Sequence, residues 1–283
     1  MEKTKIRPFG WQDKLGYAMG DMGCGFSFQL VSTFMQLFYL QYIGIKAADY
    51  AVIIIISKVF DAINDVVIGN LVDTKRIGKK SKYMPWIIAG GLILVVFNVM
   101  LFAPITSLPY AAKYAWCLVA YCLWSIAYTM VNVPYGSLHS VITSDTQEKV
   151  SLSTFRSIGG ALPAIVIMIV LPGIVYDRVP NAVTGIEEEV LKGGTLLPVA
   201  LVLSIVAFVT LWGTTKLVKE RVHREDSTES KNAATAFFSA FKSFFTNRAM
   251  VGATIASVAS VALFNSTMAL NNMVFQYFFV DTS

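Results

Sequence analysis

Charged residues are scarce in this chain of 283 residues, since only 14% are Asp, Glu, Lys or Arg while 55% are hydrophobic. Soluble domains carry about 25% charged residues, because their surface must stay in water. The mean hydropathy of +0.59 agrees with this imbalance. The composition therefore excludes an ordinary soluble globular domain and predicts an all-α polytopic membrane protein.

Cysteine is also rare. The three cysteines, Cys24, Cys117 and Cys122, all lie inside apolar stretches. They have neither the spacing of zinc ligands nor the even number in an outside loop that structural disulfides require. We therefore expect them to pack as small hydrophobic residues, and we expect no cofactor.

Long apolar runs are abundant. A helix needs about 20 residues to cross the hydrocarbon core of a bilayer. Seven continuous runs are near that length, namely Leu15–Tyr42, Tyr50–Val72, Met84–Ala103, Tyr114–Val141, Thr154–Tyr176, Leu197–Leu217 and Ala249–Phe279. We predict a six-helix bundle over 1–217, a central loop over 218–248 and a seventh membrane helix within 249–283.

The basic residues are distributed unequally between the two predicted sides of the membrane. Most of the 23 Lys and Arg residues precede the first run, follow the second, flank the start of the fifth or separate the sixth from the seventh. Loops rich in Lys and Arg stay in the cytoplasm. We therefore expect a cytoplasmic N-terminus in a cell membrane and contacts with anionic lipid, and we expect no nucleic-acid partner.

The central loop contains an aromatic helical face. Phe237, Phe241, Phe244 and Phe245 fall on one side of the segment 233–247. Such a segment predicts an amphipathic helix at the membrane interface.

The second run carries ionisable residues on one side. At about 100° per residue, Lys58, Asp61 and Asp65 fall within an arc of roughly 60°, with Asn64 about 60° further round. An unpaired charge at mid-bilayer costs about 2.5 to 3.5 kcal/mol, so these groups must face partners or a wet cavity. Two carboxylates one turn apart resist joint ionisation, and a shared proton or a bound Na⁺ relieves this repulsion.

A polar and aromatic stripe follows in the fourth run. Trp124, Tyr128, Thr129 and Asn132 recur at i, i+4, i+5 and i+8 of a helix, and Pro134 frees a backbone carbonyl about one turn earlier. Hydroxyls, amides and free carbonyls are the groups that hold a sugar or a small cation. The alternative, in which Trp and Tyr belong to an interfacial belt, stays open.

Three further ionisable residues stand near the ends of predicted helices. Asp21 either pairs near the cytoplasmic end of the first run or lines a solute path. Arg156 is either a positive-inside anchor or reaches towards the acids of the second run. Asp73 precedes the basic turn after the second run, where pairing with a neighbouring helix end would latch a conformation.

Three motifs together resemble a known family. They are Lys58-Val-Phe-Asp61-Ala-Ile-Asn64-Asp65, Lys80-Ser-Lys82-Tyr-Met-Pro85-Trp86 and Asn132-Val-Pro134-Tyr135. The sequence looks like the glycoside-pentoside-hexuronide:cation symporters, the melibiose-permease branch of the major facilitator superfamily. The resemblance implies alternating-access transport of a sugar, coupled to Na⁺, Li⁺ or H⁺.

The resemblance also implies roles for individual residues. The expected cation site comprises Asp61, Asn64, Asp65 and Thr129, in which Asp61 and Asp65 would hold monovalent Na⁺ or Li⁺. The expected sugar site comprises Lys58, Tyr128, Asn132, Arg156 and Asp21, and Asp73 is the expected conformational latch. Melibiose permease itself has an aspartate at the position of Asn132, which leaves the identity of the sugar open.

The family has twelve spans, of which this chain supplies the first six and one more. We therefore expect a fragment or truncated product that needs the missing C-terminal half for a complete pathway. Two other interpretations remain. One is a membrane-embedded enzyme in which Asp61 and Asp65 hold Mg²⁺ or form a protease dyad. The other is a non-transporting half that assembles with a partner.

Overall fold

The computed structural model describes residues 7–78, 81–180, 187–222, 246–260 and 262–263. The chain divides into two compact units, Met1–Thr228 and Glu229–Ser283. The elements of the first unit are α1 (Trp11–Leu37), the π-helical turn η1 (Phe38–Ile43), α2 (Ala47–Thr74), α3 (Met84–Leu101), α4 (Tyr110–Ile142), α5 (Thr146–Ile165), the π-helical turn η2 (Val166–Val170), α6 (Pro172–Val175), β1 (Tyr176–Pro180), β2 (Glu187–Leu191) and α7 (Gly193–Leu217).

The long helices follow the predicted apolar runs, and local signals set their starts. Pro85 lies in the first turn of α3, where its missing N–H is not needed. Asp145 caps α5 by accepting a hydrogen bond from the Glu148 backbone N–H at 2.9 Å. Within the described residues, α3, α4, the stretch Thr146–Val175 and α7 are long and apolar enough to cross a membrane. Polar and ionisable residues interrupt the apolar sequence of α1 and α2.

Part of the predicted seventh helix falls within the described residues. Residues 249–260 and 262–263 of the predicted seventh helix are helical, whereas 264–283 and residues 233–245 of the predicted amphipathic helix lie outside the described residues. The sequence did not predict the antiparallel hairpin that precedes α7, in which Tyr176 pairs with Leu191 and Pro180 with Glu187. In the described part of the chain, the fold is all α apart from this hairpin.

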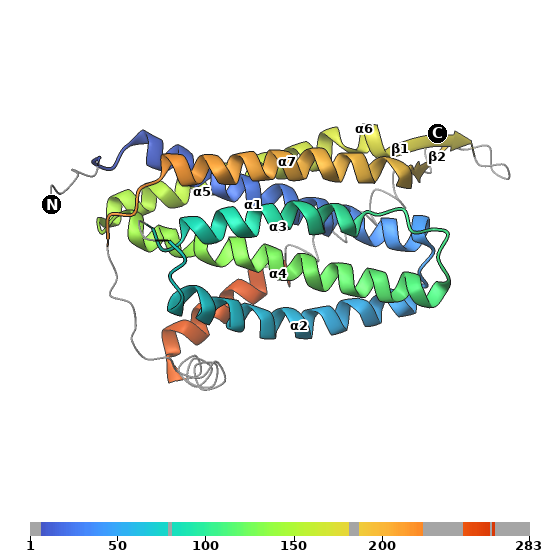
Figure 1. Ribbon diagram of the computed structural model, residues 1–283, viewed down its shortest axis with the longest axis horizontal. Coiled ribbons are helices and arrows are strands. Elements are labelled where there is room, and N and C mark those ends of the chain that lie inside the picture. Colours follow the sequence, from blue (N-terminus) through green and yellow to red (C-terminus); the bar gives the residue numbers. More distant parts are fainter. Residues whose placement is uncertain (1–6, 79–80, 181–186, 223–245, 261, 264–283) are drawn as a thin grey trace. The chain divides into compact units, whose positions relative to one another are not determined.

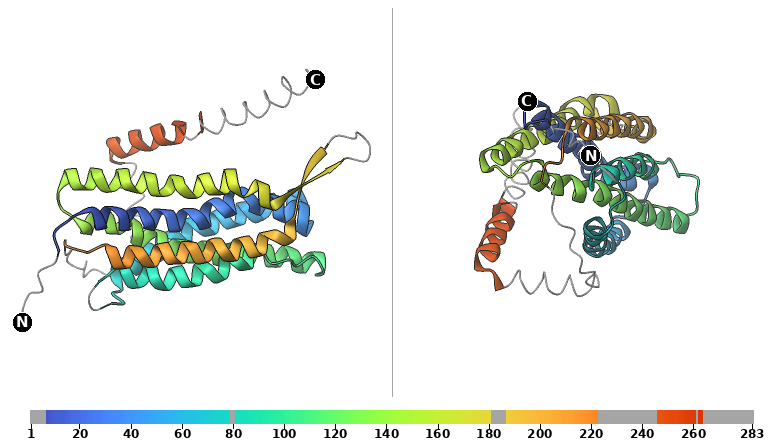
Figure 2. Two further views of the ribbon diagram at one scale, coloured as in Figure 1. Left: turned by 90° about the horizontal axis from the view of Figure 1, so that it is seen from above. Right: turned by 60° about the vertical axis from the view of Figure 1, so that its left-hand side comes forward.

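The helices of the first unit run side by side along one axis (Figures 1 and 2). Helix α1 packs between α5 and α7, α3 packs against α4 and α7, and α2 packs mainly against α4 at one edge of the bundle. The N-terminal residues and the end of α7 meet at one end, which we call the basic end after Arg7, Lys82 and Arg221. The β1–β2 hairpin lies at the opposite end (Figure 1).

Glycines permit the close approach of α1 to its neighbours. A Cβ atom at Gly159 of α5 would lie 2.2 Å from the carbonyl oxygen of Ala18 in α1. A Cβ atom at Gly23 of α1 would lie 2.7 Å from Leu211 of α7. Small residues let membrane helices pack backbone to backbone in this way. The contact between α5 and α1 sets the positions of Arg156 and Asp21.

We expect Gly159→Ala to destabilise the detergent-solubilised protein by about 1 to 3 kcal/mol, because the added methyl group meets backbone that cannot swing away. Thermal unfolding measures this change. Gly136→Ala is the matched control, since no described atom lies within 4 Å of the Cβ position at Gly136. Equal melting temperatures for the two variants would contradict the close approach of α1 and α5.

Candidate functional site

A cavity of about 240 Å³ lies between α2 and α4, with one contribution from α1. Its volume is near the lower end for small-ligand pockets and holds several waters or a solvated cation. The lining residues are Phe28 from α1, Lys58, Asp61 and Asp65 from α2, and Tyr121, Trp124, Ser125, Tyr128, Thr129, Asn132 and Val133 from α4. The structure thus brings six of the predicted site residues to one cavity wall.

Asp61 is the centre of a polar network in this wall. Lys58 Nζ lies 3.3 Å from Asp61 Oδ2 and donates a hydrogen bond to Tyr121 Oη at 3.1 Å. Ser125 Oγ donates a hydrogen bond to Asp61 Oδ1. Helix α2 therefore supplies the charges, and α4 supplies the hydroxyl groups that bind them.

Asp65 repeats the arrangement one turn later. Thr129 Oγ1 donates a hydrogen bond to Asp65 Oδ1 at 2.8 Å. Because Asp61 and Asp65 are four residues apart on α2, and Ser125 and Thr129 are four apart on α4, the two pairs face each other in register. Carboxylate and hydroxyl oxygens are the ligands that hard cations prefer. With Lys58 included and both carboxylates ionised, the group has a formal net charge of −1, which one monovalent cation neutralises.

Aromatic side chains form the adjoining part of the wall. The rings of Trp124 and Tyr128 stack with centroids 5.4 Å apart and an interplanar angle of 21°. Phe28 of α1 packs against Tyr128 at 5.6 Å. The amide of Asn132, which both donates and accepts hydrogen bonds, lines the same cavity. Apolar walls with a few polar groups are typical of a small-molecule site.

Arg156 and Asp21 form a separate pair between α5 and α1. Arg156 Nε donates a hydrogen bond to Asp21 Oδ1 at 2.9 Å. The guanidinium group also lies over the ring of Tyr135, 5.3 Å from its centroid. Neither residue is among the described residues that line the cavity. Among the described residues, Arg156 forms its ion pair with Asp21 of α1 and not with the acids of α2. Its interpretation as a positive-inside anchor stays a prediction.

Asn64 and Asp73 also lie apart from the cavity. Asn64 is 8% exposed, and its Nδ2 atom has no hydrogen-bond partner among the described residues. Asp73 lies in the last turn of α2, where its backbone carbonyl accepts a hydrogen bond from Lys82 Nζ at 2.8 Å and its side chain is exposed. The roles of Asn64 in cation selection and of Asp73 as a latch stay predictions.

The sequence reasoning missed four residues of the cavity, namely Phe28, Tyr121, Ser125 and Val133. Tyr121 and Ser125 precede Thr129 by eight and four residues, so the helical repeat places all three on one face of α4. This spacing was a usable signal. Phe28 comes from α1, and no spacing on α2 or α4 points to it.

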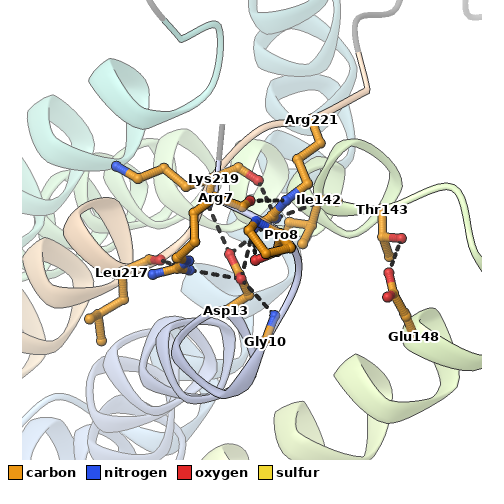
Figure 3. A network of polar contacts seen from close by, with 10 residues as sticks. All are labelled: Arg7, Pro8, Gly10, Asp13, Ile142, Thr143, Glu148, Leu217, Lys219 and Arg221. Atoms are coloured by element: carbon orange, nitrogen blue, oxygen red, sulfur yellow. Dashed lines mark hydrogen bonds and ion pairs between the residues drawn. The ribbon is translucent and has the colours of Figure 1, made fainter. Parts of the chain in front are cut away.

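A second polar cluster lies at the basic end (Figure 3). The Asp13 carboxylate is fully buried and accepts hydrogen bonds from Arg7 Nη2 at 2.7 Å and from Arg221 Nη2 and Nη1 at 2.9 and 3.1 Å. The backbone N–H groups of Gly10 and Lys219 add bonds of 3.1 and 3.2 Å. We call this arrangement the Asp13 cluster.

Arg221 extends the Asp13 cluster to α4. Its guanidinium donates hydrogen bonds to the backbone carbonyls of Arg7, Pro8 and Ile142 at 3.0, 3.2 and 3.2 Å (Figure 3). Its backbone N–H donates to the Val141 carbonyl at 2.8 Å. The cluster therefore ties the N-terminal segment, the end of α4 and the segment after α7 together.

The chain matches known transporters along almost its whole length. The family model described as "MFS/sugar transport protein" matches residues 16–282. The uncharacterized symporter YjmB of Bacillus subtilis is 30% identical over 270 residues, which cover 94% of this chain and 55% of that protein. The isoprimeverose transporter of Lactiplantibacillus pentosus is 30% identical over 223 residues, covering 78% of this chain and 44% of that protein.

The inner membrane symporter YicJ of Escherichia coli is likewise 30% identical over 223 residues, covering 77% of this chain and 45% of that protein. The chain thus spans about half the length of the curated relatives that it matches. These matches confirm the predicted resemblance to sugar:cation symporters. The chain belongs to the MFS/sugar transport family, which is a family of multi-pass membrane transporters and not of enzymes.

Proposed function

We propose that this chain carries the cation site and part of the solute site of a symporter. The transported solute is a sugar, glycoside, pentoside or hexuronide, and the coupling cation is Na⁺, Li⁺ or H⁺. The observation that carries the proposal is the register of Asp61 and Asp65 on α2 with Ser125 and Thr129 on α4 in the wall of one cavity. The names of the related symporters and sugar transporters support it.

Charge neutralisation provides the coupling. The two carboxylates and Lys58 carry a net charge of −1, which is costly to enclose in a membrane protein. A bound cation neutralises this charge, so enclosing the loaded site costs less free energy than enclosing the empty site. A ligand shifts a conformational equilibrium only through its different affinities for the two states. The cation thereby favours the state that closes around the solute.

The aromatic and amide groups suit the solute. The stacked rings of Trp124 and Tyr128 offer an apolar face to a sugar ring, and the Asn132 amide offers a donor and an acceptor to its hydroxyl groups. We propose that Arg156 and Asp21 support this site from α5 and α1, and that Asn64 selects the cation through its amide.

A second bundle completes the proposed pathway, because alternating access needs two bundles that move around a central site. We propose that the loop over 218–248 joins them and that 249–283 begins the second bundle. The basic end would face the cytoplasm of the cell membrane, with the N-terminus on the same side. Asp73 would then act as a latch at the cytoplasmic end of α2.

Uptake measurements test this function. Vesicles containing the chain, alone and in a full-length version, would receive radiolabelled methyl galactoside, methyl xyloside and methyl glucuronide under imposed Na⁺, Li⁺ or H⁺ gradients. We expect one gradient to drive uptake of one solute class by the full-length version. Uptake that ignores all three gradients would contradict cation coupling, and the absence of uptake of all three solutes would contradict sugar transport.

We expect Thr129→Val to raise the cation concentration for half-maximal uptake about tenfold, because it removes a hydroxyl bound to a charged carboxylate. Thr129→Ser keeps the hydroxyl and is expected to stay within about twofold of the parent protein. Titrating uptake against the cation at fixed solute measures the effect. If Val and Ser behave alike, the Thr129 hydroxyl does not belong to the cation site.

A further inference from the structure

A chain of buried hydrogen bonds leads from the cavity wall across the bundle. Trp124 Nε1 on α4 donates to Ser27 Oγ on α1 at 2.9 Å. Ser27 Oγ donates to Asn98 Oδ1 on α3 at 3.2 Å, and Asn98 Nδ2 donates to Ser204 Oγ on α7 at 2.7 Å. Ser204 Oγ then donates to the backbone carbonyl of Ala200 at 2.6 Å. Four helices are therefore joined by one continuous polar path.

The chemistry of the indole fixes the donor end of this path, because its N–H group cannot accept a hydrogen bond. The indole of Trp124 can only donate, so Ser27 accepts from it, and the single proton of Ser27 is donated to Asn98. The Asn98 amide accepts with its oxygen and donates with its nitrogen to Ser204, which passes its own proton to the backbone. The exposed fractions of Trp124, Ser27, Asn98 and Ser204 are 4, 1, 0 and 2%. Water therefore has little access to replace a missing partner, and each bond depends on the next.

Only the first member of this path lines the cavity. Trp124 stacks on Tyr128, which lines the cavity too, so the plane of the indole sets the position of both rings. Rotation of the indole about its side-chain bonds would break its bond to Ser27. The acids Asp61 and Asp65 bind Ser125 and Thr129 instead, and so have no part in this path.

We propose that Ser27, Asn98 and Ser204 are positioning residues that hold Trp124 as a fixed wall of the solute site. The inference rests on the proposed function in one respect, namely that the solute contacts this wall. It assigns a solute-specific effect to Asn98 and Ser204, which lie on α3 and α7 and outside the described lining of the cavity. Changes at these two residues would weaken solute binding and leave cation binding unchanged.

The orientation of Trp124 can be measured without any solute. In the full chain labelled with ¹⁵N-tryptophan, the indole N–H resonance that is missing in Trp124→Phe identifies Trp124 among the five tryptophans. We expect Ser27→Ala, Asn98→Leu and Ser204→Ala each to shift this resonance upfield, because the hydrogen bond of the indole weakens. Ser204→Ala changes the volume less than Asn98→Leu and serves as the decisive variant if Asn98→Leu does not fold.

The matched control is another buried hydroxyl on α7. Thr210 is 6% exposed, and its Oγ1 donates to the Ala207 carbonyl at 2.8 Å, as Ser204 does to Ala200. Thr210→Val removes a hydroxyl of the same kind outside the path and is expected to leave the Trp124 resonance in place. If Ser27→Ala shifts the resonance while Asn98→Leu and Ser204→Ala match Thr210→Val, the proposal is overturned.

Binding measurements test the functional half. Made in the full-length version, Asn98→Leu and Ser204→Ala are expected to raise the dissociation constant of the tritiated methyl glycoside that the full-length parent binds by about fivefold. Binding of ²²Na⁺ is expected to stay within about twofold of the parent value. Equal losses for glycoside and Na⁺ would indicate general damage and overturn the proposal. If the full-length parent binds no methyl glycoside, the proposed function fails, and the Trp124 resonance of the chain still decides whether the positioning path exists.

Discussion

Cation-dependent uptake is expected to fall at least about 100-fold when Asp65 is replaced by asparagine in the full-length transporter. The substitution removes one negative charge from a group whose net charge is −1, so Asp61 and Lys58 already neutralise each other in the variant. A cation that enters this site adds an uncompensated positive charge, which costs about 2.5 to 3.5 kcal/mol at mid-bilayer. A loss of about 100-fold corresponds to about 2.7 kcal/mol.

The same helix provides the control for this experiment. Asp49 lies in the first turn of α2 and accepts a hydrogen bond from the hydroxyl of Tyr110, so Asp49→Asn removes the same charge and weakens a similar hydrogen bond away from the cavity. We expect Asp49→Asn to keep the uptake of the parent protein. Uptake by Asp65→Asn that still follows the imposed cation gradient would show that Asp65 does not hold the coupling cation.

The acids of α2 were predictable because their evidence is local. A charged residue inside an apolar helix is costly, and the helical repeat alone places Lys58, Asp61 and Asp65 on one side. Their partners on α4 needed one more fact, the axial register of two helices, which the sequence does not contain. The two acids on α2 and the two hydroxyl residues on α4, Ser125 and Thr129, have the same spacing of four residues. Once α2 and α4 lie side by side in register, each acid therefore meets one hydroxyl group.

The sequence did not determine which acidic residue pairs with Arg156. Its charge demanded an acidic partner, and both Asp21 and the acids of α2 were available. The choice between them depends on the distance between helices, which is set by the bare backbone at Gly159 against Ala18. A glycine is visible in the sequence, but the helix that it contacts is not.

Apolar runs located the helices well, because the thickness of the bilayer fixes their length. The same reasoning passed over the short strands of the β1–β2 hairpin, which have no long apolar run. It also passed over the Asp13 cluster, since Arg221 lies 208 residues beyond Asp13. The basic residues near loops were interpreted only as signals of membrane topology. An ion pair between residues so far apart in the sequence, such as Asp13 and Arg221, produces no periodic pattern that would predict it.

Asp13→Asn is expected to destabilise the purified protein by about 3 to 5 kcal/mol, the usual cost of removing one member of a buried ion pair. Asp13 is fully buried, and the side chain of Arg221 is only 16% exposed, so the loss leaves a poorly solvated guanidinium without its carboxylate. Thermal unfolding in detergent at pH 7 measures the change. Arg221→Gln is expected to act in the same direction, whereas Lys219→Gln removes an equal charge from an exposed side chain and is expected to change little.

The pH dependence of the folding stability distinguishes an electrostatic contribution of Asp13 from a contribution through packing. Asp13 precedes the apolar run that begins at Leu15. Burial raises the pKa of its carboxyl group, but hydrogen bonds and charges from Arg221 and Arg7 lower it further, so the pKa lies below the ordinary value of 3.8. A group with a lowered pKa stabilises the folded state fully above its unfolded pKa, and that stability is lost as the pH falls through the folded pKa. The parent protein should therefore lose stability below about pH 5 while Asp13→Asn loses less, and the gap between their melting temperatures should narrow. A gap that stays constant from pH 7 to the acid limit of folding would mean that Asp13 contributes through packing and not through its charge.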